Sequence, residues 1–378
     1  MVSQSPKLFQ RYRLGHLVLS NRVVLSPLTR TRANEKHELD DLAVEYYSQR
    51  ASTPGTLLIS EATIIAHKAG GWPLAPGIWT EKQLEAWKKA SNCAHPVHAK
   101  GGYIFCQIWA LGRVARLDST SEAEGIELVG PGSIPMTGRK KPRLLTVDEI
   151  KEYAQLFAAA AKNAVSVGFD GVEVHAANGY LVDQFFQDVT NDRTDEYGGS
   201  VENRIRFALE VMDAIVAAIG APRASLRINA WTNYQEMGMA DPIPTFATFA
   251  TRLAERHPDL AYLHVCESDT PEAKTSAGVL HSNEPIRKAW GPRTYITSNN
   301  YTRESAIEAA EKDEHTLVGF GQKFLANPDL VRRLKENLPL NEPDYTTYYV
   351  GGARGYTDYP FAPSVAASVA TPTVDATA

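Results

Sequence analysis

The fold of this 378-residue chain is decided by the stretch Gly171-Val172-Glu173-Val174-His175-Ala176-Ala177-Asn178-Gly179-Tyr180. An apolar run leads directly into a histidine, an asparagine and a tyrosine. A buried strand that ends in this way places two hydrogen-bond donors and a phenol where a parallel sheet opens into a cleft. We therefore expect a ligand site at the carboxyl end of this strand.

Short apolar runs of the same kind recur along the chain, separated by longer helical patterns. Alternation of strands and helices is typical of βαβ units and a parallel sheet. The predicted strands are 22–25, 56–61, 103–109, 171–175, 225–229, 262–265, 294–297 and 316–320. Eight such units predict an α/β fold, a (β/α)8 TIM barrel that forms one domain over residues 1–361, with its active site at the carboxyl ends of the strands.

The helices between these strands have recognisable ends. Thr146-Val147-Asp148-Glu149 is a capping box, in which the threonine and glutamate side chains each bind a backbone N–H of the first turn. Thr80-Glu81-Lys82-Gln83 opens a second helix in the same way, and Gly168 fits a carboxyl-terminal cap. Further helices are predicted over 201–219, 244–255 and 303–310.

Two segments depart from the repeat. Residues 110–145, after the third strand, are rich in glycine, proline and polar residues. An excursion of this length in a barrel is typically functional, so we expect it to cap the site. Residues 362–378 are small, polar and proline-containing, which predicts a disordered tail.

The composition excludes several classes of function. A formal net charge of −5 and a pI near 6.1 argue against nucleic acid or an anionic membrane as partners. Three scattered cysteines predict neither a disulfide framework nor a metal site. The chain starts with a polar segment and has no apolar run of the ~18 residues needed to cross a membrane, so we expect a cytoplasmic protein.

A second motif follows shortly after the first, Asn191-Asp192-Arg193-Thr194-Asp195-Glu196-Tyr197-Gly198-Gly199-Ser200-Val201-Glu202-Asn203-Arg204. Together the two motifs closely resemble the Old Yellow Enzyme family of flavin-dependent ene-reductases, and the likeness extends over about residues 8–360. The resemblance implies bound FMN, NADPH as reductant and a small α,β-unsaturated substrate. It is compatible with a fungal branch of secondary metabolism and with a monomer or homodimer.

The resemblance assigns roles to the residues of the first motif. His175 and Asn178 match the pair that donates to the substrate's oxygen, and Tyr180 matches the proton donor. Donors fixed where negative charge develops stabilise the transition state more than the ground state. Trp109 and Tyr356 match aromatic residues that border the substrate pocket, although a core role for Trp109 is the alternative.

Other positions match residues that hold the flavin ring. Gln107 offers both a donor and an acceptor, which suits the mixed edge of an isoalloxazine. Arg227 matches the arginine that stabilises the reduced, anionic ring. Pro27, Thr29 and Ala62 match further ring contacts, although a strand followed by a capped turn explains Pro27 and Thr29 equally well.

The expected phosphate site departs from the family pattern. It lies at the seventh and eighth strand ends, at Asn299, Asn300, Gly321 and Gln322. The family usually has glycine at the position of Asn299 and arginine at that of Gln322. Loss of a charged bidentate ligand costs about 1–3 kcal/mol, and Lys323, as the neighbour on a strand, would point to the opposite face. We therefore expect FMN to be held more weakly than usual.

Two other functions remain open at this point. Asn229-Ala230 stands where the family often has Ser-Pro, and Glu236 adds a carboxylate on a nearby loop. An isomerase or cyclase acting on an unsaturated natural product would use Tyr180 or Glu236 to move protons, with flavin a spectator or absent. A solvated Glu236 is the simpler interpretation. A degenerate barrel kept only for binding is the third hypothesis.

Overall fold

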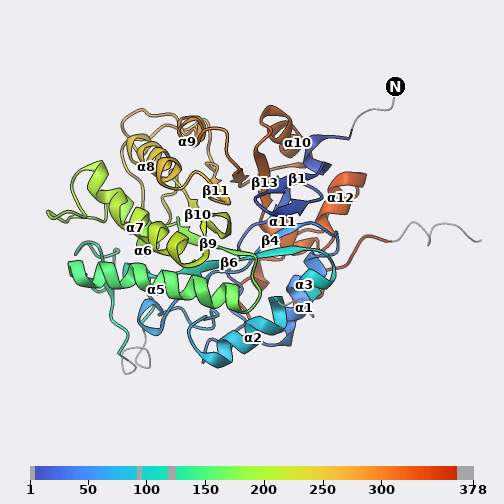
Figure 1. The fold of residues 1–378 in the computed structure, drawn as a ribbon, viewed down its shortest axis with the longest axis horizontal. Helices are drawn as coiled ribbons and strands as arrows, with labels where there is room; N and C mark the ends of the chain where they lie inside the picture. The colour runs from blue at the N-terminus through green and yellow to red at the C-terminus, as the bar shows by residue number, and fades with distance from the viewer. Residues whose placement is uncertain (1–4, 92–95, 118–124, 364–378) are drawn as a thin grey trace, which may run out of the picture.

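A closed ring of eight parallel strands organises the part of the chain that this computed structural model describes, residues 5–91, 96–117 and 125–363. Each strand lies within two residues of its predicted ends, and the prediction of a (β/α)8 barrel is confirmed (Figure 1). The strands are β3 (Val23–Leu25), β4 (Leu57–Ile59), β6 (Tyr103–Trp109), β9 (Gly171–Ala176), β10 (Ala224–Ile228), β11 (Tyr262–Cys266), β12 (Tyr295–Ser298) and β13 (Thr316–Phe320).

The strands pair in chain order except at one place. A short extra strand, β5 (Thr63–Ile64), pairs with the far end of β6, while β4 pairs with the start of β6. Pairing of β13 with β3 closes the ring. Because all strands run parallel, their carboxyl ends meet at one mouth of the barrel, where the site residues were predicted.

The opposite end of the barrel is plugged by a hairpin that the sequence analysis did not predict. Strands β1 (Tyr12–Leu14) and β2 (Leu17–Leu19) pair antiparallel, and Gly15 between them has a φ of 56°. Leu14, Leu17 and Leu19 of the hairpin are buried, and they form one apolar cluster with side chains from several barrel strands, including Val24 and Phe105.

Helices surround the strands (Figure 1). They are α1 (Asp41–Arg50), α2 (Glu81–Ser91), α3 (Pro96–Ala99), α5 (Val147–Ser166), α6 (Leu181–Phe186), α7 (Val201–Ile219), α8 (Ile243–Arg256), α9 (Glu284–Trp290), α10 (Arg303–Lys312), α11 (Gln322–Ala326) and α12 (Leu330–Glu336). The predicted capping box at the start of α5 is confirmed, since Thr146 Oγ1 accepts from the Glu149 N–H at 3.2 Å and Glu149 Oε2 accepts from the Thr146 N–H at 2.8 Å.

The excursion over residues 110–145 is described except for residues 118–124. It contains a short 3-10 helix (Gly112–Val114) and the two-residue strands β7 (Val129–Gly130) and β8 (Arg143–Leu144). Arg113 Nη2 donates to the Gln235 carbonyl at 2.9 Å, so the excursion is tied to the loop after β10 at the barrel mouth.

Of the predicted disordered tail, residues 362–378, only Ala362 and Pro363 are described, and the prediction of disorder is wrong for Ala362. Ala362 is buried, and its N–H donates to Asp329 Oδ2 at 2.8 Å, which holds it against the start of α12. Residues 364–378 lie outside the described residues, as does Cys93, while Cys106 and Cys266 are buried and free. Among the helices of the described residues, none combines the length and the apolar character that crossing a membrane requires.

Candidate active site

The register of the barrel brings residues from three strands together at its mouth. His175 of β9 pairs with Arg227 of β10, and Gln107 of β6 pairs with Glu173, two residues before His175. Since residues two apart on a strand share a face, His175 and Glu173 lie on the same face of β9. These are the strand-end positions at which the sequence predicted the site.

One end of the mouth is an aromatic cluster, which we call the donor end, formed by His175, Trp109 and Tyr180 with Asn178 beside it. The Tyr180 ring lies edge-on to the rings of both Trp109 and His175, with centroids 4.7 Å apart in each case. His175 Nδ1 and Trp109 Nε1 are buried and have no hydrogen-bond partner among the described residues. A buried polar atom without a hydrogen bond is energetically unfavourable. A ligand that bonded to either of these two atoms would therefore be stabilised.

Asn178 is held in position by a second asparagine. Asn229 Nδ2 donates to Asn178 Oδ1 at 2.9 Å, so the carbonyl oxygen of Asn178 is already an acceptor and its amino group remains for donation. Asn178 has a φ of 60°, in the left-handed region that asparagine tolerates better than most residues. Asn229, which departs from the family pattern, thus orients the side chain of Asn178, a residue that is predicted to bind the substrate.

A buried carboxylate fixes the turn between Asn178 and Tyr180. Asp183 Oδ2, on α6, accepts from the Gly179 N–H at 2.8 Å, and burial raises the pKa of Asp183 to about 7. Gly179 has a φ of 83°, and a Cβ there would lie 2.8 Å from Gln235 Cβ, so only glycine fits without strain. Sequence reasoning missed Asp183, whose only signal was an acidic residue within the first turn of a helix.

Burial sets the protonation states at the donor end. Burial, and then the nearby Arg227, lowers the pKa of His175 well below its usual value, so the imidazole is neutral near pH 7. Burial raises the pKa of Tyr180, so its hydroxyl stays protonated well above neutral pH. A neutral imidazole and a protonated phenol are both hydrogen-bond donors.

A chain of polar side chains crosses the barrel interior beneath these groups. Glu173 accepts from Gln107 Nε2 and bonds to His264 Nδ1, each at 2.8 Å, and His264 Nε2 bonds to Ser298 Oγ at 2.8 Å. Glu173 and His264 are fully buried. The chain fixes the Gln107 amide while leaving its carbonyl oxygen to accept. The sequence analysis did not identify Glu173 or His264 as part of the site.

The other end of the mouth, which we call the terminal end, is a hollow of about 320 Å³. It brings together the four residues predicted to bind the phosphate and two that were predicted to contact the flavin ring, Pro27 and Arg227. They are Pro27, Arg227, Asn299, Asn300, Gly321 and Gln322.

Lys323 lines the same hollow, which corrects one inference from the sequence. Gln322 and Lys323 belong to α11 and not to a strand, so strand alternation does not apply to them. Lys323 Nζ donates to the Tyr301 carbonyl at 2.6 Å, while Gln322 Oε1 accepts from the Tyr345 hydroxyl at 3.2 Å.

The remaining predicted site residues, Ala62, Thr29 and Tyr356, do not line the hollow of the terminal end. Ala62 is buried just before β5, and Thr29 is half-buried two residues after Pro27. Tyr356 has no exposed surface; it stacks on Tyr46 with ring centroids 4.3 Å apart, and the Arg32 guanidinium lies 4.4 Å from its centroid. Its role as a substrate contact stays a prediction.

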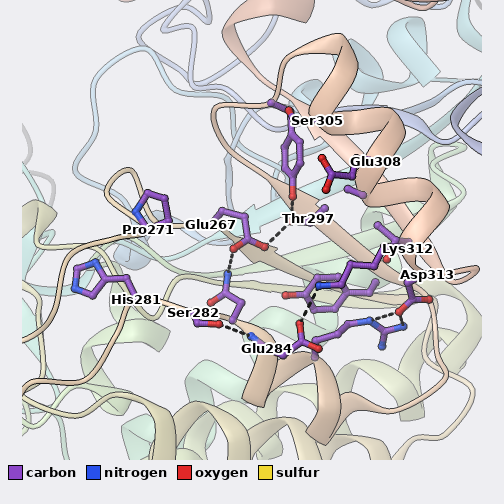
Figure 2. Close-up of a pocket in the computed structure, with 16 residues that line it drawn as sticks. Glu267, Pro271, His281, Ser282, Glu284, Thr297, Ser305, Glu308, Lys312 and Asp313 are labelled. Atoms are coloured by element: carbon purple, nitrogen blue, oxygen red, sulfur yellow. Dashed lines mark hydrogen bonds and ion pairs between the residues drawn. The ribbon is translucent and has the colours of Figure 1, made fainter.

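A second hollow, of about 470 Å³, lies between α9 and α10 and contains none of the predicted site residues (Figure 2). Figure 2 shows the Glu267 carboxylate at its inner end, where Oε1 accepts from Thr297 Oγ1 at 2.7 Å and Oε2 accepts from Asn283 Nδ2 at 2.9 Å. These bonds anchor the segment that follows β11.

A closed parallel barrel whose strand ends converge on unshared donors defines an α/β-barrel enzyme with its ligand site at one mouth. The sequence profile of the NADH:flavin oxidoreductase / NADH oxidase family matches residues 7–341, and the chain belongs to that family. The predictions of an oxidoreductase and of an Old Yellow Enzyme relationship are confirmed.

Individual relatives agree with this placement. The chain is 43% identical to the NADP-dependent oxidoreductase lnbE of Aspergillus flavus, over 94% of this chain and 96% of that protein. The fold matches the crystal structure of Old Yellow Enzyme from Pichia sp. AKU4542 with a TM-score of 0.85 and 34% identity, over 94% of each chain. It matches morphinone reductase in complex with tetrahydroNAD with a TM-score of 0.85 and 38% identity, over 95% of this chain and 98% of that one.

The family implies a flavin, and several groups at the barrel mouth have the chemistry to receive one. The Arg227 side chain and the free carbonyl oxygen of Gln107 provide a cation and an acceptor at the barrel mouth. The unshared Nδ1 of His175 provides a further polar contact above them. The terminal end differs, because its predicted ligands already bind one another or neighbouring groups.

Proposed function

We propose that this protein is an FMN-dependent ene-reductase that reduces the activated C=C bond of an α,β-unsaturated carbonyl compound with NADPH. The observation that carries the proposal is the convergence of His175, Asn178 and Tyr180 at the barrel mouth, with two buried polar atoms left unshared. Family membership supports the flavin and the nicotinamide reductant.

The bound flavin would supply the redox chemistry, accepting hydride from the nicotinamide and passing it to the substrate's β-carbon. His175 and the amino group of Asn178 would hold the carbonyl oxygen. Negative charge grows on that oxygen as hydride adds, so donors fixed there lower the barrier. Because His175 is neutral, it acts as a hydrogen-bond donor and not as a cation.

Tyr180 would deliver the proton to the α-carbon. Its pKa is raised by burial, so it carries a proton throughout the neutral range. Edge-on contacts with Trp109 and His175 fix its ring. A positioned general acid contributes roughly 10²–10⁴-fold to a proton-transfer step.

NADPH as reductant and a natural-product substrate are supported by the relatives. The Aspergillus flavus relative is named as NADP-dependent, and morphinone reductase binds a nicotinamide analogue. We expect the protein to bind FMN more weakly than the family usually does, because the neutral Gln322 lines the terminal end where an arginine is expected.

The test is the visible spectrum of the purified protein, incubated with FMN and freed of excess. A flavin band that NADPH bleaches under anaerobic conditions, and that an α,β-unsaturated ketone restores, is the expected result. A colourless protein that stays inactive after addition of FMN contradicts the proposal.

The isomerase alternative gains no support at Glu236. Its carboxylate is exposed, and hydrogen bonding by the Thr137 side chain, and then by the Thr137 N–H at 2.9 Å, lowers the pKa of Glu236. A carboxylate held ionised by a backbone N–H is a poor acid. The contact instead ties the excursion to the loop after β10.

A further inference from the structure

The terminal end contains a carboxylate that the sequence analysis did not connect with the cofactor. Asp269, three residues beyond β11, lines the same hollow as Asn299, Asn300 and Gln322. Its side chain is exposed at the rim of the hollow. A negative charge at the rim of a phosphate site is unfavourable to a phosphate group, which itself carries a charge of about −1.5 to −2.

Asp269 also occupies the donors that would otherwise face a phosphate. Its Oδ1 accepts from Asn299 Nδ2 at 2.7 Å and from Asn300 Nδ2 at 2.8 Å. The Asn299 amide further donates to the Glu267 carbonyl at 3.0 Å, so both of its N–H groups have acceptors. Both asparagines therefore bind this carboxylate, and Asn299 has no side-chain N–H left for a phosphate, whereas Asn300 keeps one.

The position of Asp269 is fixed by its neighbours. Glu267, two residues earlier, is bonded through its carboxylate to Thr297 and Asn283 and through its N–H to the Ser298 carbonyl at 2.8 Å (Figure 2). The segment that carries Asp269 is thus anchored at its start to β12 and to the residue preceding α9.

The hollow also contains two cations, Lys323 and Arg227, so Asp269 reduces its positive charge without reversing it. Lys323 Nζ is bonded to the Tyr301 carbonyl, and the Arg227 Nε donates to Cys266 Sγ at 3.2 Å. Gln322 adds hydrogen-bonding capacity without charge. A neutral hydroxyl group can bind among these donors and acceptors without the repulsion that a dianion experiences.

We propose that Asp269 weakens this site's hold on the phosphate of FMN, so that its preference for FMN over riboflavin, whose chain ends in an uncharged hydroxyl, is smaller than the two cations alone would give. The proposal rests on the proposed flavin-dependent function and concerns this chain's terminal end alone. Two charges on phosphate about 5 Å from a carboxylate in water correspond to roughly a tenfold loss of affinity.

The experiment is a titration of flavin-free protein with riboflavin and with FMN, followed by quenching of flavin fluorescence. Asp269→Asn is the test variant because it removes the charge and keeps the oxygen that accepts from the two asparagines. Glu272→Gln is the matched control, since Glu272 is an exposed carboxylate three residues along the same loop and does not line the hollow.

The wild-type protein is expected to bind FMN no more than about tenfold more tightly than riboflavin. Asp269→Asn should strengthen FMN binding about tenfold and change riboflavin binding by less than about twofold, and added salt should reduce the difference between the variants. Glu272→Gln should change neither dissociation constant.

Two results overturn the proposal, and they can be told apart. If the wild type binds FMN more tightly than riboflavin and Asp269→Asn does not change this preference, the role of Asp269 is overturned. The proposed function then still stands. Failure of the wild type and of both variants to bind either flavin overturns the proposed function and this inference with it.

Discussion

The donor end and the terminal end of the barrel mouth differ in how much of their hydrogen-bonding capacity is left for a ligand. At the donor end, His175 Nδ1 and Trp109 Nε1 are buried and unshared. At the terminal end, Asn299, Asn300 and Lys323 already bind internal acceptors, one of them a carboxylate. Preorganised donors serve a reaction only where they are unpaired before the ligand arrives. The chain has thus kept the groups needed for chemistry while altering those that anchor the cofactor.

Removal of the phenol at the donor end is expected to have the largest effect. Tyr180→Phe should slow substrate reduction by about 10³-fold, because no other acid contacts the reacting carbon, while flavin reduction by NADPH stays within about twofold. Anaerobic stopped-flow measurement of the two half-reactions separates these rates. Equal losses in both would show that Tyr180 shapes the pocket and does not transfer the proton.

Removal of the imidazole is expected to have a somewhat smaller effect. His175→Ala should lower kcat/KM for the unsaturated substrate by about 10²-fold, because one oxyanion donor is lost while Asn178 remains. Asn229→Ala, which frees the carbonyl of Asn178, should act in the same direction by about tenfold. Unchanged substrate kinetics in His175→Ala would place the oxygen-binding site elsewhere.

At the terminal end, restoring a cation should strengthen cofactor binding. Gln322→Arg is expected to lower the dissociation constant for FMN by about tenfold, through a charge-assisted contact with phosphate, and to leave riboflavin nearly unaffected. Fluorescence titration measures both constants. An equal gain for the two flavins would mean that position 322 contacts the ribityl chain and not the phosphate.

The pH dependence is the smallest expected effect and tests the protonation states of the donor end. The lowered pKa of His175 means that it charges only well below pH 6.5, and the raised pKa of Tyr180 means that it ionises only above its usual value near 10. The rate of substrate reduction should therefore stay level from about pH 6.5 to 9. An inflection near pH 6.5 that His175→Gln abolishes would show instead that His175 titrates normally.

The sequence predicted the barrel because its strands are short, apolar and regularly spaced, and because capping boxes such as Thr146–Glu149 mark helix starts locally. It predicted that His175, Asn178 and Tyr180 lie together because all three follow one strand, and their roles in catalysis stay predictions. It could not show that Asp269 reaches Asn299 and Asn300, which lie about thirty residues further on and meet it only through the pairing of β11 with β12. The buried partners Glu173 and His264 were invisible for the same reason, since they are 91 residues apart.

The β1–β2 hairpin has a consequence for the order of events during turnover. Its leucines seal the amino ends of the strands with apolar packing, so nothing passes through the barrel from that side. Under the proposed function, the reductant and the substrate would both have to reach the flavin from the carboxyl-end mouth and would compete for it. We therefore expect the reductant and the substrate to inhibit each other's binding at high concentration, because the hairpin closes the other end of the barrel.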